Sequence, residues 1–158
     1  MQPKITPFLW FDTQAEEAAE FYVSLFPNSR VVSVHRYPEG APMPAGTAMM
    51  VTFELEGVTF QAMNAGPHFK FNEAVSFMID CGDQAEVDHY WDGLLAGGGE
   101  PSQCGWLKDR YGLSWQVTPR RLIELNTSKE PGVAERAMAA MMTMSKIDIA
   151  TLEEAARG

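Results

Sequence analysis

Two short sequence patterns each occur twice in this chain, and the repetition limits the possible folds more than any other feature. Gln14-Ala15-Glu16 recurs as Gln84-Ala85-Glu86. Gly57-Val58-Thr59-Phe60-Gln61 recurs, as glycine, aliphatic, hydroxyl, aromatic and glutamine, in Gly112-Leu113-Ser114-Trp115-Gln116. Both pairs come in the same order along the chain. A tandem repeat of one supersecondary unit explains this order better than a coincidence of common turn and strand residues.

The first copy predicts a strand, a helix and three further strands. Ile5–Phe11 is an apolar run that indicates a buried strand. Thr13 and Glu16 have the spacing of a capping box, which favours a helix start at this point. Three strands are then expected, and the last two show the alternation of half-buried strands around a tight turn at Glu56-Gly57. These strands span about 30–37, 49–55 and 58–63.

The second copy predicts the same order of elements. A strand is expected over 75–80, and Asp83 with Glu86 forms the second helix cap. The helix should end at the three glycines 97–99, because glycine accepts a left-handed backbone. Short strands are expected around 102–107 and 113–118, with a turn at 109–112.

The predicted fold class is therefore α+β, with two strand–helix–three-strand modules forming curved mixed sheets. The modules span about 4–65 and 74–120, and together they are expected to form a single domain over 1–120. Residues 121–158 are expected to form a C-terminal helical extension, with Asp148 capping its last helix.

The amino-acid composition limits which kinds of molecule this protein is expected to bind. The chain has 158 residues with 46% apolar residues, and its 12 basic and 21 acidic side chains give a net charge of 12 − 21 = −9. An acidic surface repels phosphate backbones, so nucleic acid is not an expected partner.

No apolar run approaches the roughly 20 residues that cross a membrane. Met1–Ile5 lacks the apolar core of a signal peptide, and Cys81 and Cys104 lack zinc-site spacing. We expect a cytoplasmic protein whose two cysteines are reduced, buried and small.

The chain also resembles a known family in four segments. They read Ile-Thr-Pro-Phe-Leu-Trp-Phe-Asp at 5–12, Cys-Gly-Trp-Leu at 104–107, Tyr-Gly-Leu-Ser-Trp-Gln-Val at 111–117 and Met-Ser-Lys-Ile-Asp-Ile at 144–149. The chain resembles the PhnB-like group, also labelled 3-demethylubiquinone-9 3-methyltransferase, of the glyoxalase/bleomycin-resistance/dioxygenase (vicinal oxygen chelate) superfamily. The resemblance implies a concave face on each sheet and pairing of two chains as a homodimer.

The resemblance also implies where a metal would bind. Metal-dependent members take ligands from the first and last strand of each module. Counting back six residues from Asp12 and Asp80 gives Thr6 and Ala74, and the last-strand positions are Gln61 and Gln116. Alanine cannot bind a metal, and neutral glutamines hold a divalent ion weakly. We therefore expect neither a metal nor another cofactor, with a metal-dependent lyase, isomerase or dioxygenase as the alternative.

We expect the concave faces to bind a small aromatic or quinone-like molecule. Strand alternation assigns residues 58, 60 and 62 to the helix side, which leaves their neighbours for the concavity. His68 is included because it lies in a linker, and linkers often border pockets. The candidate lining residues are Thr6, Phe8, Trp10, Thr59, Gln61, Met63, His68, Ser114 and Gln116.

Two other interpretations compete with this one. Core side chains could fill the pocket, so that it binds nothing. Methyl transfer, which the family label suggests, would favour a glycine-rich turn between a strand and a helix. The glycines 97–99 follow a helix instead, so this function is less favoured. His35 and His89 are expected on solvated surfaces, without a metal.

Overall fold

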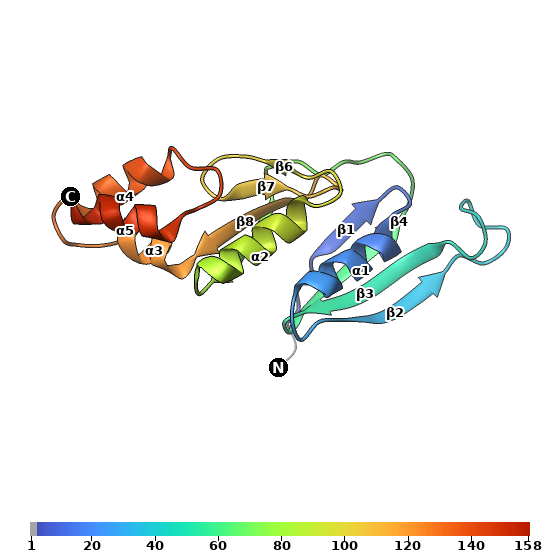
Figure 1. Ribbon diagram of the computed structural model, residues 1–158. Coiled ribbons are helices and arrows are strands. Elements are labelled where there is room, and N and C mark those ends of the chain that lie inside the picture. The colour runs from blue at the N-terminus through green and yellow to red at the C-terminus, as the bar shows by residue number, and fades with distance from the viewer. Residues whose placement is uncertain (1–2) are drawn as a thin grey trace. The chain divides into compact units, whose positions relative to one another are not determined.

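The computed structural model describes residues 3–158, which contain eight strands and five helices. They divide into two compact units, one ending at Lys70 and the other spanning Phe71–Gly158. Each unit contains one copy of the predicted module, and each module forms a four-stranded mixed sheet (Figure 1).

In the first unit the strand order is β1-β4-β3-β2, with β1 parallel to β4 and the other pairs antiparallel. In the second it is β5-β8-β7-β6, again with only the first pair parallel. The tandem α+β prediction is therefore confirmed. The elements are β1 (Phe8–Phe11), α1 (Ala15–Leu25), β2 (Arg30–Arg36), β3 (Ala48–Leu55), β4 (Val58–Asn64), β5 (Ser76–Cys81), α2 (Gln84–Leu95), β6 (Glu100–Pro101), β7 (Trp106–Lys108) and β8 (Ser114–Pro119).

One face of the first sheet is the core of its unit. α1 lies along this face (Figure 1) and contacts β3, β2, β4 and β1. Its buried residues are alanines and Tyr22, whose ring stacks on Phe53 at 6.1 Å. Small alanines let the helix approach the sheet closely, while the aromatic rings fill the remaining space. Along β4 the buried side chains are Phe60, Ala62 and Asn64.

The two module helices begin differently. The predicted Thr13–Glu16 capping box is wrong: the first helix has Gln14 at its cap position, and that side chain makes no capping bond. Instead, the N–H of Ala15 donates to Oδ1 of buried Asn64 at 2.8 Å. Glu16 is unavailable because its carboxylate binds Arg36.

The predicted cap of the second helix is confirmed. Oδ1 of Asp83 accepts the N–H of Glu86 at 2.9 Å, and the Glu86 carboxylate accepts the N–H of Gly82 at 2.7 Å. The helix ends as expected, with Ala96 at its C-cap and Gly97 at a φ of 83°.

Two hairpin turns require a left-handed backbone. Glu56 and Gly57 have φ values of 45° and 84°, which fit the predicted tight turn between β3 and β4. The single strand expected over 102–107 is instead a hairpin, with β6 and β7 on either side of a turn. Cys104 and Gly105 have φ values of 60° and 85° there, and the N–H of Ser102 donates to the carbonyl of Trp106. Sequence alternation misses this turn because Cys104 is not a usual turn residue.

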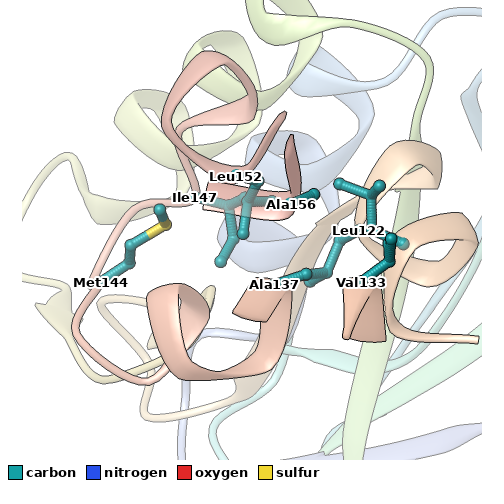
Figure 2. Packing of buried hydrophobic residues seen from close by; sticks show 8 residues of the cluster. Leu122, Val133, Ala137, Met144, Ile147, Leu152 and Ala156 are labelled. Atoms are coloured by element: carbon teal, nitrogen blue, oxygen red, sulfur yellow. The ribbon is translucent and has the colours of Figure 1, made fainter. Parts of the chain in front are cut away.

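The C-terminal extension forms three helices that pack into their own apolar cluster (Figure 2). They are α3 (Arg120–Asn126), α4 (Val133–Met141) and α5 (Ile149–Arg157). Asp148 caps the last helix as predicted, by accepting the N–H of Thr151. The buried members of the cluster are Leu122, Leu125, Val133, Ala137, Met144, Ile147, Leu152 and Ala156.

The segment before α5 is bound to the second module. The side chain of Gln84 donates to the carbonyl of Ile147 and accepts the N–H of Ile149. Lys146 pairs with Asp88 at 3.0 Å, and the amides of Cys104 and Gly105 donate to carbonyls of this segment. The extension is therefore part of the second unit. No helix in residues 3–158 is long and apolar enough to cross a bilayer.

Candidate functional site

The first sheet has an open face opposite α1, and strand register determines which residues share it. Phe8 pairs with Gln61, and Trp10 pairs with Met63. Phe8 is 48% exposed, whereas Trp10, Gln61 and Met63 are half-buried. Thr59 also lies on this face and is exposed. The structure thus places the first-module strand candidates on one surface.

Residues on the neighbouring strands extend this face. Gln61 pairs with Thr52, and Met63 pairs with Met50. His35 pairs with Met50 and is exposed, so its imidazole stands on the open face at a solvated position, as expected. A bulge beside Val32 shifts the register of β2, and sequence alternation could not locate this shift.

Trp10 is held in place by the segment after β4. Its indole N–H donates to the carbonyl of Gly66 at 2.9 Å. The ring of His68 lies edge-on at 6.5 Å and that of Phe69 at 4.9 Å. Two candidates, Trp10 and His68, are therefore brought together. Phe69, which is 66% exposed, completes the aromatic group and was missed because nothing in the sequence ties this linker residue to Trp10.

Thr6 is placed differently from the prediction. It precedes β1 and is exposed, because the strand begins only after Pro7, whose carbonyl accepts the N–H of Gln61. Its counterpart in the second module is also corrected. Phe8 and Met78 both lie opposite a last-strand glutamine, an offset of 78 − 8 = 70 residues. Gln14 and Gln84 differ by the same 84 − 14 = 70.

Ser76, not Ala74, is therefore the counterpart of Thr6, and Asp80 is the counterpart of Trp10 rather than of Asp12. The predicted register of the second module is therefore displaced by two residues. Because side chains in a strand alternate with a period of two, a shift of two leaves every residue on its original face and cannot be detected from the pattern.

The two last-strand glutamines have different partners. Nε2 of Gln116 donates to Oγ of Ser76 at 2.9 Å. The side-chain amide of Gln61 has no hydrogen-bond partner among residues 3–158, and the residue is half-buried. Gln116 also pairs with Trp106 on β7, which adds an indole to the open face of the second sheet.

A cavity of about 180 Å³ lies on the second sheet. Ser114 lines it and is only 1% exposed, and its Oγ has no partner among the described residues. Lys108 stands beside Ser114 and forms an ion pair with Glu73. The hydrogen bond in this pair is the main cause of a raised pKa for Lys108 and a lowered pKa for Glu73. Sequence reasoning missed Lys108 because the strand was expected to end at Leu107.

The residues present do not fit a divalent ion. The first- and last-strand positions of each module offer only hydroxyls and neutral amides, from Thr6 and Gln61 and from Ser76 and Gln116. Residues 3–158 contain no cluster of three histidine, cysteine, aspartate or glutamate side chains that could hold an ion. These donors bind divalent ions more weakly than carboxylates or imidazoles do.

The two cysteines also differ. Cys81 is fully buried inside β5, and burial, followed by the nearby carboxylates, raises the pKa of its thiol to about 12. The prediction that both cysteines are buried is wrong for Cys104, which is half-buried at the hairpin turn with its Sγ 3.8 Å from Sδ of Met142.

A larger cavity, of about 540 Å³, lies between α2, α3 and α5. Its two cationic groups are already paired. Arg120 binds Asp80, and Arg121 binds both Glu124 and Glu153. The cavity on the open sheet face offers an unpaired polar group instead, so it is the better candidate for a ligand.

Comparison with known proteins agrees with this fold. The family model described as 3-demethylubiquinone-9 3-methyltransferase matches residues 3–118. A solved structure of a putative 3-demethylubiquinone-9 3-methyltransferase, PhnB protein, from Bacillus cereus is 37% identical, with 74% of this chain and 99% of that one covered and a TM-score of 0.69. No curated protein sequence matches the chain significantly.

Two more distant structures share the fold alone. Protein PA1353 from Pseudomonas aeruginosa is 19% identical, with 75% of this chain and 98% of that one covered and a TM-score of 0.61. The fosfomycin resistance protein FosX from Listeria monocytogenes is 12% identical, with 75% and 93% covered and a TM-score of 0.51. α3, α4 and α5 lie beyond the end of the family match. The chain therefore belongs to the 3-demethylubiquinone-9 3-methyltransferase family, the PhnB-like group.

Proposed function

We propose that this protein binds a small aromatic or quinone-like molecule on the open faces of its sheets, without a metal ion. The observation that carries the proposal is the group around Trp10. A half-buried indole is fixed by its bond to Gly66, and the paired strand β4 carries the unbonded side-chain amide of Gln61. A rigid aromatic surface beside a free amide suits a flat ligand that has a polar edge.

Each side chain has a separate role in this proposal. Trp10 and Phe8 offer ring faces for stacking on a flat molecule. Met50 and Met63 are flexible and polarisable, so they can adjust to the outline of the ligand. The Gln61 amide donates a hydrogen bond to a carbonyl oxygen, which is the polar group of a quinone.

A metal-dependent lyase, isomerase or dioxygenase is the alternative within this fold. It is disfavoured because the ligand positions carry neutral hydroxyls and amides. Methyl transfer, which the family label suggests, is disfavoured because the strand-to-helix turns are not glycine-rich. Residues 12–14 contain no glycine, and the corresponding turn of the second module contains only Gly82.

We further propose that the protein acts as a homodimer in the cytoplasm. Phe8 and Met78 leave 48% and 57% of their surfaces exposed on the open faces, and a second copy could cover apolar surface of this kind. Both cysteines are free thiols, as a reducing compartment favours. Sedimentation at micromolar concentration tests the dimer, and a clean monomer contradicts it.

Titration with duroquinone, followed by two-dimensional NMR of the indole and side-chain amide signals, tests the ligand proposal. This quinone is fully substituted and therefore does not alkylate the half-buried thiol of Cys104. We expect shifts at Trp10 and Gln61, and a dissociation constant raised about fivefold by Gln61→Leu, the effect of one hydrogen bond. Gln103→Leu, in the exposed hairpin turn, is the matched control and should bind as the wild type does.

Two results would overturn the proposal. One is the absence of any shift at Trp10 and Gln61 at saturating quinone. The other is a stoichiometric divalent ion in the purified protein that is lost when Gln61 and Gln116 are both changed to alanine. Elemental analysis measures the second directly.

A further inference from the structure

The open face of the second sheet carries a polar row with one member from each strand. Strand pairing places Ser76 beside Ser114, Ser114 beside Lys108, and Lys108 beside Glu100. The 180 Å³ cavity lies over the last three of these residues. Its other lining residues are Glu73, Pro101, Ser102, Trp106 and Leu107. Drug-sized ligands occupy roughly 300–1,000 Å³, so this space suits a molecule of one ring.

Ser114 is the member of the row that indicates a ligand. Its neighbour Ser76 is bonded to Gln116, whereas Oγ of Ser114 is buried and has no partner among the described residues. A buried hydroxyl without a partner destabilises the fold, and native proteins rarely leave one in this state. A ligand with an acceptor atom in the cavity would satisfy it.

The charges around the cavity determine what kind of acceptor fits. Lys108 is paired with Glu73, and Glu100 lies beside Lys108 on the next strand. One ammonium and two carboxylates give a local charge of 1 − 2 = −1, in a chain of net charge −9. An anionic ligand meets this negative field, and a cationic one meets the ammonium group. An uncharged carbonyl avoids both and loses the least hydration on entry.

Trp106 supplies the shape requirement. It lines the cavity, is half-buried and pairs with Gln116. An indole at a cavity wall favours a flat ring that can stack on it or meet it edge-on. We infer that the second module binds an uncharged single-ring molecule whose carbonyl accepts a hydrogen bond from the Ser114 hydroxyl, in the cavity beside Lys108 and Trp106. This inference rests on the proposed function and names its ligand class for the second sheet.

Three probes of nearly equal shape test the charge requirement: benzamide, benzoate and benzylamine. Each is titrated into the full chain while the Trp106 indole N–H signal is followed by NMR. We expect benzamide to bind about tenfold more tightly than benzoate and benzylamine. Ser114→Ala should weaken benzamide binding about fivefold, as the loss of one hydrogen bond does. Glu100→Gln should narrow the preference for benzamide over benzoate, because it removes one of the two carboxylates.

Matched controls are Ser24→Ala and Glu56→Gln, which remove a hydroxyl and a carboxylate from exposed positions in the first unit. The inference is overturned if benzoate or benzylamine binds as tightly as benzamide, if Ser114→Ala binds benzamide normally, or if no probe moves the Trp106 signal. These failures are distinct from failure of the proposed function, because duroquinone binding is measured at Trp10 and Gln61.

Discussion

The two modules share a strand order and a last-strand glutamine, but the surroundings of these features have diverged. In the first module the amide of Gln61 is unbonded, and α1 is capped from a distance by Asn64. In the second, Gln116 is bonded to Ser76, and Asp83 caps α2 locally. Only the second module is continuous with α3, α4 and α5.

This difference shows that backbone pairing and side-chain chemistry can vary independently in a duplicated fold. The parallel pairing of the first and last strands places a glutamine on the open face in both modules. What that glutamine can do depends on its neighbour across the strand. Ser76 lies within β5 and accepts a hydrogen bond from the Gln116 side chain, whereas its counterpart Thr6 precedes β1 and the Gln61 side chain stays unbonded.

The largest contrast is expected at the buried end of the first strands, where Phe11 of β1 corresponds to Cys81 of β5. Burial, with help from nearby carboxylates, raises the pKa of the Cys81 thiol from 9.0 to about 12. At pH 8 its thiolate fraction is therefore about a thousandfold below that of an ordinary thiol. Iodoacetamide should label Cys104 in the native protein and Cys81 only after unfolding.

The same shift predicts a loss of stability in alkali. In the unfolded chain the pKa of the Cys81 thiol is 9.0, whereas in the folded chain the thiol keeps its proton until the pH reaches about 12. The free energy of unfolding should therefore decrease as the pH rises from about 9 to about 12, and Cys81→Ala should remove this part of the decrease. Labelling of both cysteines at equal rates in the native state would contradict the burial of Cys81.

The next largest effect concerns the helices that belong to the second unit alone. Leu152 is fully buried in their cluster (Figure 2), so Leu152→Ala should lower the free energy of unfolding by about 2–5 kcal/mol. Ile123 is 47% exposed on α3, and Ile123→Ala should cost less than about 1 kcal/mol. Urea denaturation of both variants measures the difference. Equal effects would show that the cluster does not support the second unit.

The two helix caps should also differ in strength. Asn64 is 1% exposed, accepts the N–H of Ala15 and donates to the carbonyl of Ala48. Asn64→Ala leaves both backbone groups buried without a partner, and it should cost about 2–3 kcal/mol. Asp83→Ala removes only an exposed local cap and should cost about 1 kcal/mol. Thermal unfolding tests the order, and a larger loss for Asp83→Ala would reverse the comparison.

These caps illustrate what the sequence could reveal. Asp83 and Glu86 act within one turn, so their spacing was sufficient to predict the cap. Asn64 reaches α1 across 49 positions of the chain, and no local pattern records such a bond. The order of elements along the chain and the repeat were predictable because they depend on alternation and turns. The two-residue register error and the Ser114 cavity depend on which strands pair, which alternation does not determine.

The smallest expected effect has an unusual sign. Ser114→Ala replaces a buried, unpartnered hydroxyl with a hydrogen, so it should raise the free energy of unfolding by up to about 1 kcal/mol. Ser76→Ala, its neighbour in the same row, breaks the bond to Gln116 and should lower that energy by about 1 kcal/mol. Chemical denaturation of the two variants resolves the opposite signs.

A hydroxyl that weakens the fold but strengthens ligand binding is expected of a residue kept for function rather than for stability. If both serine variants are destabilised equally, the Ser114 hydroxyl has a hydrogen-bond partner in the folded protein, such as a bound water. The cavity would then lose the polar group that makes it a candidate, whereas the Trp10 surface of the first module would be unaffected.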